Sequence, residues 1–346
     1  MMMKRRIALG WLLSVSLVLA ASPFAQASGP ETRFPRLSLK LTGGVGFLSG
    51  GGGDLETLRT DTQAIFQSLA PIDRFTSSFD WKRLPTAPEM GAELILSLNA
   101  HFGLGLGSGY IFGSRSQGAF SYGYSVAQYL QGSAYSQDDH AAYTQDFKFR
   151  AVPIHADIYL FNEFGGFTVY AYGGAELCFA SLDHIYSVTA ALQDKGLSTY
   201  APHTEHDVDM TLTARETAKS RALGGRAGLG FEVKLAGPLS LGIEVNGRIL
   251  RLNDWTGEGT IDGQTRVRDW MDGLGWYNDK TTAESFSPSG KWLYTFDFDP
   301  SLRYLYTLEN LLLESQKPPS STYFKSREAV IDLGGVGAVL SLRYRF

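Results

Sequence analysis

The sequence predicts an all-β fold, namely a closed antiparallel eight-stranded transmembrane β-barrel with long extracellular loops that carry short helices and hairpins. Three observations predict this class. Apolar side chains recur at every second position in eight segments, as in strands with one apolar face. Short turns and long connections alternate strictly between the segments, and glycine is frequent, with 39 of 346 residues. A barrel in a lipid bilayer has these features, because every backbone group must pair and no edge can stay open.

The first 27 residues have the three parts of a secretory signal peptide. A basic stretch from Lys4 to Arg6 precedes an apolar run from Ile7, and Ala25-Gln26-Ala27 forms a small-x-small cleavage site. We therefore predict a mature chain that begins at Ser28, a periplasmic segment over residues 28–35, and the barrel over residues 36–346. No later apolar run approaches the roughly 20 residues of a membrane helix.

Eight strands follow in chain order, and three short turns join six of them into hairpins. The predicted strands cover residues 36–47, 90–98, 102–112, 152–160, 167–179, 223–235, 239–249 and 336–346. The short turns are centred on residues 99–101, 161–166 and 236–238, and the long connections cover about 48–89, 114–149, 181–220 and 251–328. This alternation predicts long loops outside the cell and both termini in the periplasm.

Two further runs leave the number of strands open. KWLYTFDF and LRYLYTL, on either side of Asp299-Pro300, also alternate and would make a ten-stranded barrel. They lack the glycines of the other eight segments, which favours an external hairpin, or a strand and a helix. A soluble antiparallel barrel or sandwich would alternate as well, but it would not place charges on its inner face.

The last strand, VGAVLSLRYRF, and the three glycine-rich hairpins carry a family resemblance. The alternating residues Leu340, Leu342, Tyr344 and Phe346 look like the C-terminal signal that the barrel-assembly machinery reads. In these segments the chain resembles the small eight-stranded outer-membrane β-barrels, the class of the outer membrane protein A transmembrane domain. The resemblance implies a place in the cell outer membrane, with lipid and lipopolysaccharide as partners. It implies no particular activity, because anchors, adhesins, conduits and lipid-modifying enzymes share this barrel.

The inward positions of the predicted strands hold a charge network in two layers. It consists of Lys40, Glu93, His155, Asp157, Glu176, Arg226, Glu232, Glu244, Arg248 and Arg343. An eight-stranded barrel is just wide enough for its own side chains, and unpaired charges there would be costly. We expect mutual salt bridges, with Glu176 paired to Arg226, Arg248 or both. A gated ion or proton path is the functional alternative.

The first and fourth connections contain the apolar residues expected outside the membrane. Residues 54–69 have helical spacing, with Asp54 as the N-cap and Leu55, Leu58, Ile65, Phe66 and Leu69 on one face. A helix there would cover the barrel mouth, dock on the fourth connection or rest on the lipopolysaccharide surface, and its polar face of mixed sign favours the first two positions. A candidate external aromatic cap comprises Trp255, Trp270, Trp276, Trp292 and Tyr294. These rings would form either a packed core or stacking platforms for a sugar or apolar ligand.

The sequence predicts no catalytic residue, no cofactor and no nucleic-acid partner. Lone Cys178, on the inward face of its strand, excludes an intramolecular disulfide and a CxxC motif, and the net charge of −4 disfavours nucleic acid. A divalent metal at His203 and His206, with the acidic neighbours Glu205, Asp207 and Asp209, stays open. The chain therefore predicts a structural or surface-interaction role, through an extracellular ligand or protein. The alternative is a conduit for small apolar molecules.

Overall fold

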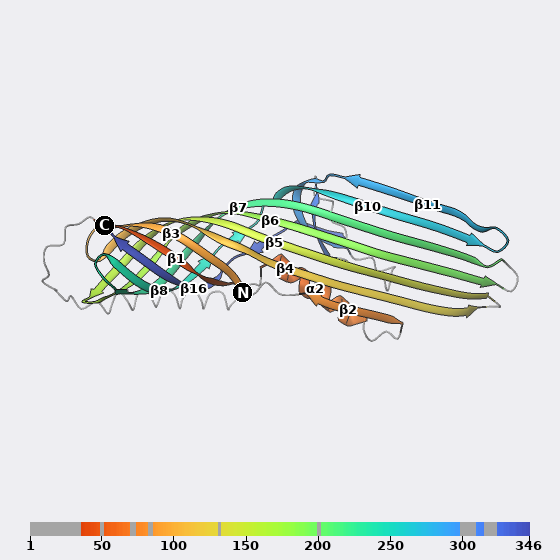
Figure 1. The fold of residues 1–346 in the computed structure, drawn as a ribbon, viewed down its shortest axis with the longest axis horizontal. Helices are drawn as coiled ribbons and strands as arrows, with labels where there is room; N and C mark the ends of the chain where they lie inside the picture. Colours follow the sequence, from red (N-terminus) through yellow and green to blue (C-terminus); the bar gives the residue numbers. More distant parts are fainter. Residues whose placement is uncertain are drawn as a thin grey trace.

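The computed structural model describes residues 36–48, 52–69, 74–81, 86–130, 133–198, 202–297, 309–314 and 324–346 (Figure 1). The chain is all-β and antiparallel, with a 14-stranded sheet, a two-stranded sheet and one helix in this part. That helix is not long and apolar enough to span a membrane. The predicted signal peptide and the segment 28–35 lie outside the described residues.

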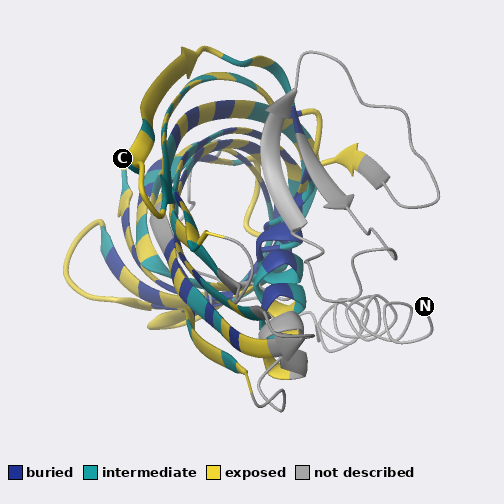
Figure 2. Cartoon of the chain, turned by 90° about the vertical axis from the view of Figure 1, so that its right-hand side faces the viewer, coloured by how far each residue is buried: buried dark blue, intermediate teal, exposed yellow. Residues whose placement is uncertain are grey.

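Eight strands pair in a cycle, which we call the ring (Figure 2). Each strand pairs with the next one, and the last pairs with the first. In order, they are β1 (Arg36–Leu48), β3 (Thr86–Ser97), β4 (Phe102–Leu130), β5 (Ser133–Phe164), β6 (Phe167–Ser198), β7 (Thr204–Lys234), β8 (Leu239–Ile249) and β16 (Gly335–Arg345). Each of the eight predicted strands falls on one of these elements.

The predicted loops at residues 114–149 and 181–220 are wrong in their described part, because residues 114–130, 133–149, 181–198 and 204–220 continue the strands. β4 to β7 are 29 to 32 residues long and pair with one another beyond the ring. We call the parts of β4 to β7 that lie beyond the ring their upper parts. β2 (Phe75–Trp81) pairs with upper β4, β10 (Thr256–Met271) pairs with upper β7, and β11 (Gly275–Phe286) pairs with β10. We call this part the extension sheet (Figure 1). Its outer face is rich in Thr, Ser and Ala, so its hydrophobic alternation is weak and the segments look like loops.

The strand number is higher than the predicted eight. β12 (Ser289–Asp297) pairs with β10, β13 (Glu309–Glu314) and β14 (Phe324–Glu328), and it does not enter the ring. β9 (Arg251–Leu252) pairs with β15 (Ile331–Asp332). The run KWLYTFDF therefore does form a strand, but outside the ring. The run LRYLYTL lies outside the described residues.

Helix α2 (Asp54–Leu69) docks on the fourth connection, one of its two expected positions. Asp54 accepts a hydrogen bond of 2.7 Å from the backbone N–H of Val330, and its carboxylate pairs with Arg327. Leu55 and Leu58 are buried in the apolar core above the ring. Asp54 thus ties two distant segments together. The predicted N-cap at Asp54 is wrong, because the helix begins at this residue and the carbonyl of Gly53 accepts from the N–H groups of Glu56 and Thr57. The side chains at positions 65, 66 and 69 lie outside the described ones.

The apolar core above the ring is largely aromatic. Trp81 stacks on Phe147 with a centroid separation of 6.1 Å, and Phe120 stacks on Tyr143 at 4.8 Å. Cys178 is fully buried at the lower end of this core, on the inward face as predicted.

Candidate functional site: the ring interior

Lys40 is at the centre of the polar interior. Its Nζ lies 2.9 Å from Glu93 Oε2 and 3.4 Å from Glu244 Oε1, and it donates a hydrogen bond of 2.5 Å to the Tyr159 hydroxyl. The Lys40 side chain is 1% exposed, and both carboxylates are equally shielded from solvent. Burial of an unpaired charge is costly. Two carboxylates and a hydroxyl around the ammonium group of Lys40 compensate the cost of burying its charge.

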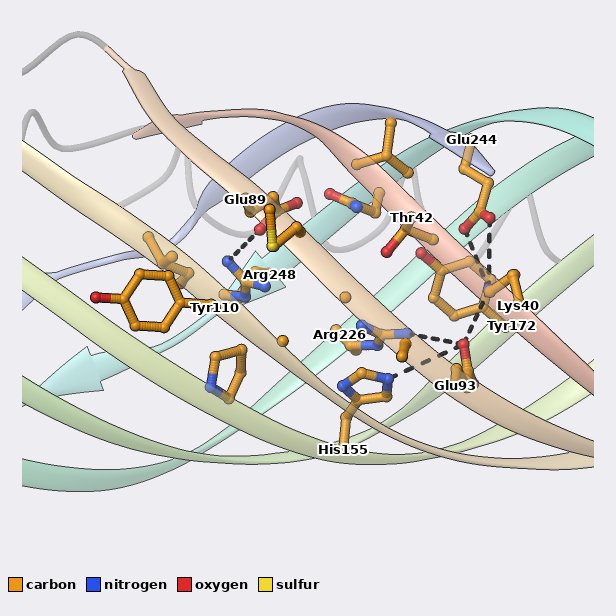
Figure 3. Close-up of a pocket in the computed structure, with 18 residues that line it drawn as sticks. Lys40, Thr42, Glu89, Glu93, Tyr110, His155, Tyr172, Arg226, Glu244 and Arg248 are labelled. Carbon is orange, nitrogen blue, oxygen red and sulfur yellow. Dashed lines mark hydrogen bonds and ion pairs between the residues drawn. The ribbon is translucent and has the colours of Figure 1, made fainter. Parts of the chain in front are cut away.

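Two arginines form the next layer up (Figure 3). Arg226 Nη2 lies 2.8 Å from Asp157 Oδ2 and 3.6 Å from Glu93 Oε2. Arg248 binds Glu176 at 2.9 Å and Glu89 at 3.1 Å. Glu176 thus pairs with Arg248, one of its two predicted partners, whereas Arg226 pairs with Asp157. Arg226 lies opposite Gly174 in the register, and Asp157 faces the same glycine from the other side, so the two side chains meet over it.

The lowest layer contains Glu232, Arg343 and Arg345. Arg343 Nη1 lies 3.6 Å from Glu232 Oε2, Arg345 Nη2 lies 3.3 Å from the same oxygen, and Arg343 Nε donates a 2.9 Å hydrogen bond to Ser38. All ten predicted network residues therefore face the ring interior. They form three groups rather than the two layers that were predicted.

His155 faces the same cavity without a hydrogen bond among the described residues. Its Nε2 lies 3.9 Å from Glu93 Oε2 and 3.8 Å from Asp157 Oδ2, and both ring nitrogens are buried. The three side chains place their oxygen and nitrogen atoms close enough together to ligate a metal. Lys40 and Arg226 already neutralise the two carboxylates, so a divalent cation would compete with both. We therefore assign no metal to this cluster.

A tyrosine layer that the sequence analysis missed encloses Lys40. The rings of Tyr159, Tyr170 and Tyr172 have their centroids 4.9, 5.8 and 5.1 Å from Lys40 Nζ. Tyr170 and Tyr172 lie opposite Gly230 and Gly228, where an added Cβ would collide with the rings. The sequence signal for this layer was the pairing of inward tyrosines with inward glycines, which the pattern of charges does not reveal.

The interior cavity is small. Its volume is about 40 Å³, and it lies among Lys40, Glu93, His155, Arg226 and Arg248 (Figure 3). Since one water needs about 10–15 Å³ of such space, the cavity has room for roughly three waters. The side chains thus fill the ring interior. Ser97 lines a different cavity, next to the short turns of the ring.

The candidate aromatic cap does not converge on one site. Trp255 and Trp292 are buried, with their rings 6.1 Å apart in the core. Trp292 Nε1 donates a 3.4 Å hydrogen bond to Glu216, which also binds the buried His184 at 3.1 Å. Trp270 lies against His203, with ring centroids 5.0 Å apart, and Trp276 is 49% exposed. The side chain of Tyr294 lies outside the described ones.

The two histidines of the candidate external metal site do not converge either. Residues three apart in an extended segment point to opposite faces. His206 Nδ1 lies 2.5 Å from Asp269 Oδ1, while His203 Nε2 lies 3.5 Å from Glu205 Oε1. A hydrogen bond from Asn278, and then the one from His206, lowers the pKa of Asp269. Among the described residues, the His203 and His206 set forms no metal-ligand cluster.

The outward face of the ring is apolar and exposed. Its large exposed side chains include Leu37, Leu41, Leu94, Leu106, Ile158, Leu177, Phe231, Leu241, Ile243 and Val245. Leu340, Leu342, Tyr344 and Phe346 of the predicted assembly signal also point outward and are 62%, 40%, 43% and 70% exposed. These features define the chain as an antiparallel β-protein with an apolar exterior and an ion-paired interior in its ring.

No family model and no curated protein matches the chain. Among solved structures, the outer membrane protease OmpT from Escherichia coli is similar at 7% identity and a TM-score of 0.22, over 90% of this chain and 94% of that one. The Pseudomonas putida toluene transporter TodX is similar at 9% identity and a TM-score of 0.15, over 95% and 93%. TM-scores this low assign neither a fold nor a function.

Proposed function

We propose that the ring is a closed eight-stranded transmembrane β-barrel in a cell outer membrane, and that the protein has a structural or surface-interaction role there. The apolar exterior of the ring is the observation that carries the proposal. A soluble protein rarely exposes a contiguous apolar patch larger than a few hundred Å². Here the large exposed apolar residues lie on all eight strands, and the ion pairs of Lys40 and Arg226 lie in the interior. This arrangement suits lipid outside and paired charges inside.

The extension sheet then lies outside the cell. Short turns gather at the end of the ring where Phe346 lies, and the long strands leave from the other end (Figure 1). A strand crosses a bilayer in about 9–11 residues, so roughly twenty residues of each of β4 to β7 extend beyond the lipid. Outer-membrane barrels have short turns on the periplasmic side and long segments on the extracellular side.

A hollow on the outer face of the extension sheet supports the surface-interaction role. Its volume is about 430 Å³, within the range of ligand pockets. Two neighbouring rungs of the sheet line it, namely Ser121, Ala142, Thr189 and Thr211, and Gly123, His140, Ala191 and Asp209. Hydroxyl, imidazole and carboxylate groups around a floor of small residues suit a polar extracellular ligand or a protein loop.

Ile243→Arg tests the membrane embedding. Ile243 is 55% exposed on the outward face of β8, and an arginine near the bilayer midplane should destabilise the folded state by about 2–4 kcal/mol. Thr144→Arg is the control, because Thr144 is exposed on the same side of the sheet but above the ring. Urea unfolding in phospholipid vesicles, followed by far-UV circular dichroism, measures both variants. Equal stability of the two variants would contradict a lipid-facing ring.

Planar-bilayer recordings separate the proposed role from the conduit for small molecules. The cavity of about 40 Å³ among ion-paired side chains predicts no stable conductance above the bare-membrane background. Replacement of Lys40 and Arg226 together by alanine removes the two cations beside that cavity and should open leak currents. Steady ion conductance by the unmodified protein would contradict a filled interior and favour the conduit.

A further inference from the structure

An exposed tryptophan lies on the same face of the extension sheet as the hollow. Trp276 in β11 is opposite Trp270 in β10, which is in turn opposite Glu205 in the neighbouring β7 (Figure 1). Glu205 is six residues from Thr211, which lines the hollow, and residues an even number apart in a strand point to the same face. The Trp276 ring is therefore on the outer face, where it is 49% exposed.

Arg268 connects the hollow to this ring. Its Nη2 lies 3.3 Å from Oδ2 of Asp209, which lines the hollow. Its guanidinium carbon lies 5.4 Å from the centroid of the Trp276 ring, and a cation at this distance attracts the ring and helps to hold it in place. The six residues of β7 between the two features span roughly 20 Å, at about 3.3 Å per residue. The hollow and the ring together therefore suit an elongated ligand.

The charges on this part of the outer face are paired within the sheet. The pairs, at 2.6 to 3.6 Å, are Lys195–Glu205, Arg266–Asp279, Arg268–Asp207, Arg268–Asp209 and His140–Asp138. Carboxylates outnumber the Lys and Arg side chains in these pairs, so the face does not favour an acidic ligand. The core of a protein–protein interface is depleted of charged residues, so the face also suits a protein loop poorly.

A neutral sugar chain matches these features better. Its hydroxyl groups can donate to carboxylate oxygens in place of water, and hydrogen bonds to an ionised acceptor are strong. Its apolar ring faces can pack on an aromatic ring, and on a floor of small residues such as Ala142 and Ala191. The paired carboxylates keep lone pairs for such hydroxyls, because each oxygen accepts more than one hydrogen bond.

From this arrangement we infer that the outer face of the extension sheet binds a neutral glycan, which runs from the hollow to Trp276. Asp209 and His140 bind sugar hydroxyls at the hollow, and Trp276 stacks on a sugar ring further along the chain. The inference rests on the proposed surface-interaction role and names the class of ligand for it.

Isothermal titration calorimetry tests the site, with the full chain folded in lauryldimethylamine oxide micelles, whose headgroup is not a sugar. Maltohexaose, cellohexaose and N-acetylchitohexaose are the neutral probes, and hexagalacturonate is the acidic probe. At least one neutral probe should give a saturable heat of binding, with an affinity at least tenfold higher than that of hexagalacturonate.

Two variants and two matched controls locate the site, all at exposed positions. Trp276→Ala removes the stacking ring and should weaken binding roughly tenfold. Ala142→Trp fills the hollow and should weaken binding at least as much. Phe286→Ala removes an exposed ring from the opposite face of β11, and Thr144→Trp adds the same bulky ring outside the hollow. Both controls should bind like the unmodified protein.

The embedding test with Ile243→Arg is separate, so the two proposals can fail independently. A chain that embeds in vesicles but binds no neutral probe overturns the glycan site, leaves the membrane proposal intact and makes a protein loop the better occupant of the hollow. Sugar binding by a chain that does not embed supports the site and contradicts the membrane barrel. Preference for hexagalacturonate, or equal weakening by the variants and their controls, would also overturn the site.

Discussion

Replacement of Arg226 by methionine should lower the free energy of unfolding by about 3–5 kcal/mol, because it leaves buried carboxylates without their cation. Arg226 lies 2.8 Å from Asp157 and 3.6 Å from Glu93, and Asp157 has no exposed side-chain surface. Urea unfolding in phospholipid vesicles, followed by far-UV circular dichroism, measures the loss.

The double variant Arg226→Met with Asp157→Asn should be milder than the sum of its two single variants, since it removes both charges of the closest pair. Arg266→Met is the control, because the Arg266–Asp279 pair is exposed on the extension sheet and surface pairs contribute little. Additive losses in this cycle would mean that Arg226 and Asp157 do not interact directly.

Deletion of residues 255–325, with a short Gly/Ser turn across the gap, should preserve the ring and disrupt the extension. Every pairing of the ring cycle involves residues outside the deletion. The core above the ring would lose Trp255 and Trp292, which are 0% and 1% exposed, together with the pairing of β10 to upper β7. We therefore expect heat-modifiable electrophoretic migration to persist, and upper β5 to β7 to become sensitive to protease.

The control for the deletion is Trp276→Ala, which removes an exposed ring from the same segment and should leave protease resistance unchanged. Loss of heat-modifiable migration in the deleted chain would show that the ring depends on β10 to β12. In that case, the ring and the extension sheet would form a single folding unit.

The eight ring strands were predictable, because outward apolar and inward polar or small side chains alternate with a period of two. Leu37, Leu39 and Leu41 against Ser38 and Lys40 display this pattern without any tertiary information. The inward position of Cys178 and of the ten network residues follows from the same alternation. The alternation is strong there because the large outward side chains of the ring are apolar, while its interior holds paired charges.

The extension sheet could not be predicted in the same way. In upper β5, buried Ala141, Tyr143 and Gln145 alternate with exposed Ala142 and Thr144, and neither set is strongly apolar or polar. Water satisfies exposed backbone and hydroxyl groups equally well in a loop and in a strand. What identifies these residues as strands is their pairing with upper β4 and upper β6, which the sequence of one segment does not contain.

The sequence by itself determined the ring strands, which side chains face inward and the need for the interior charges to pair. Only the tertiary structure decided the partners, because Arg226 meets Asp157 where Gly174 leaves space, while Arg248 reaches Glu176 and Glu89. It also decided that the tyrosine rings close over Lys40. Alternation specifies a face, but the distance between two charges depends on register, side-chain length and the glycines between them.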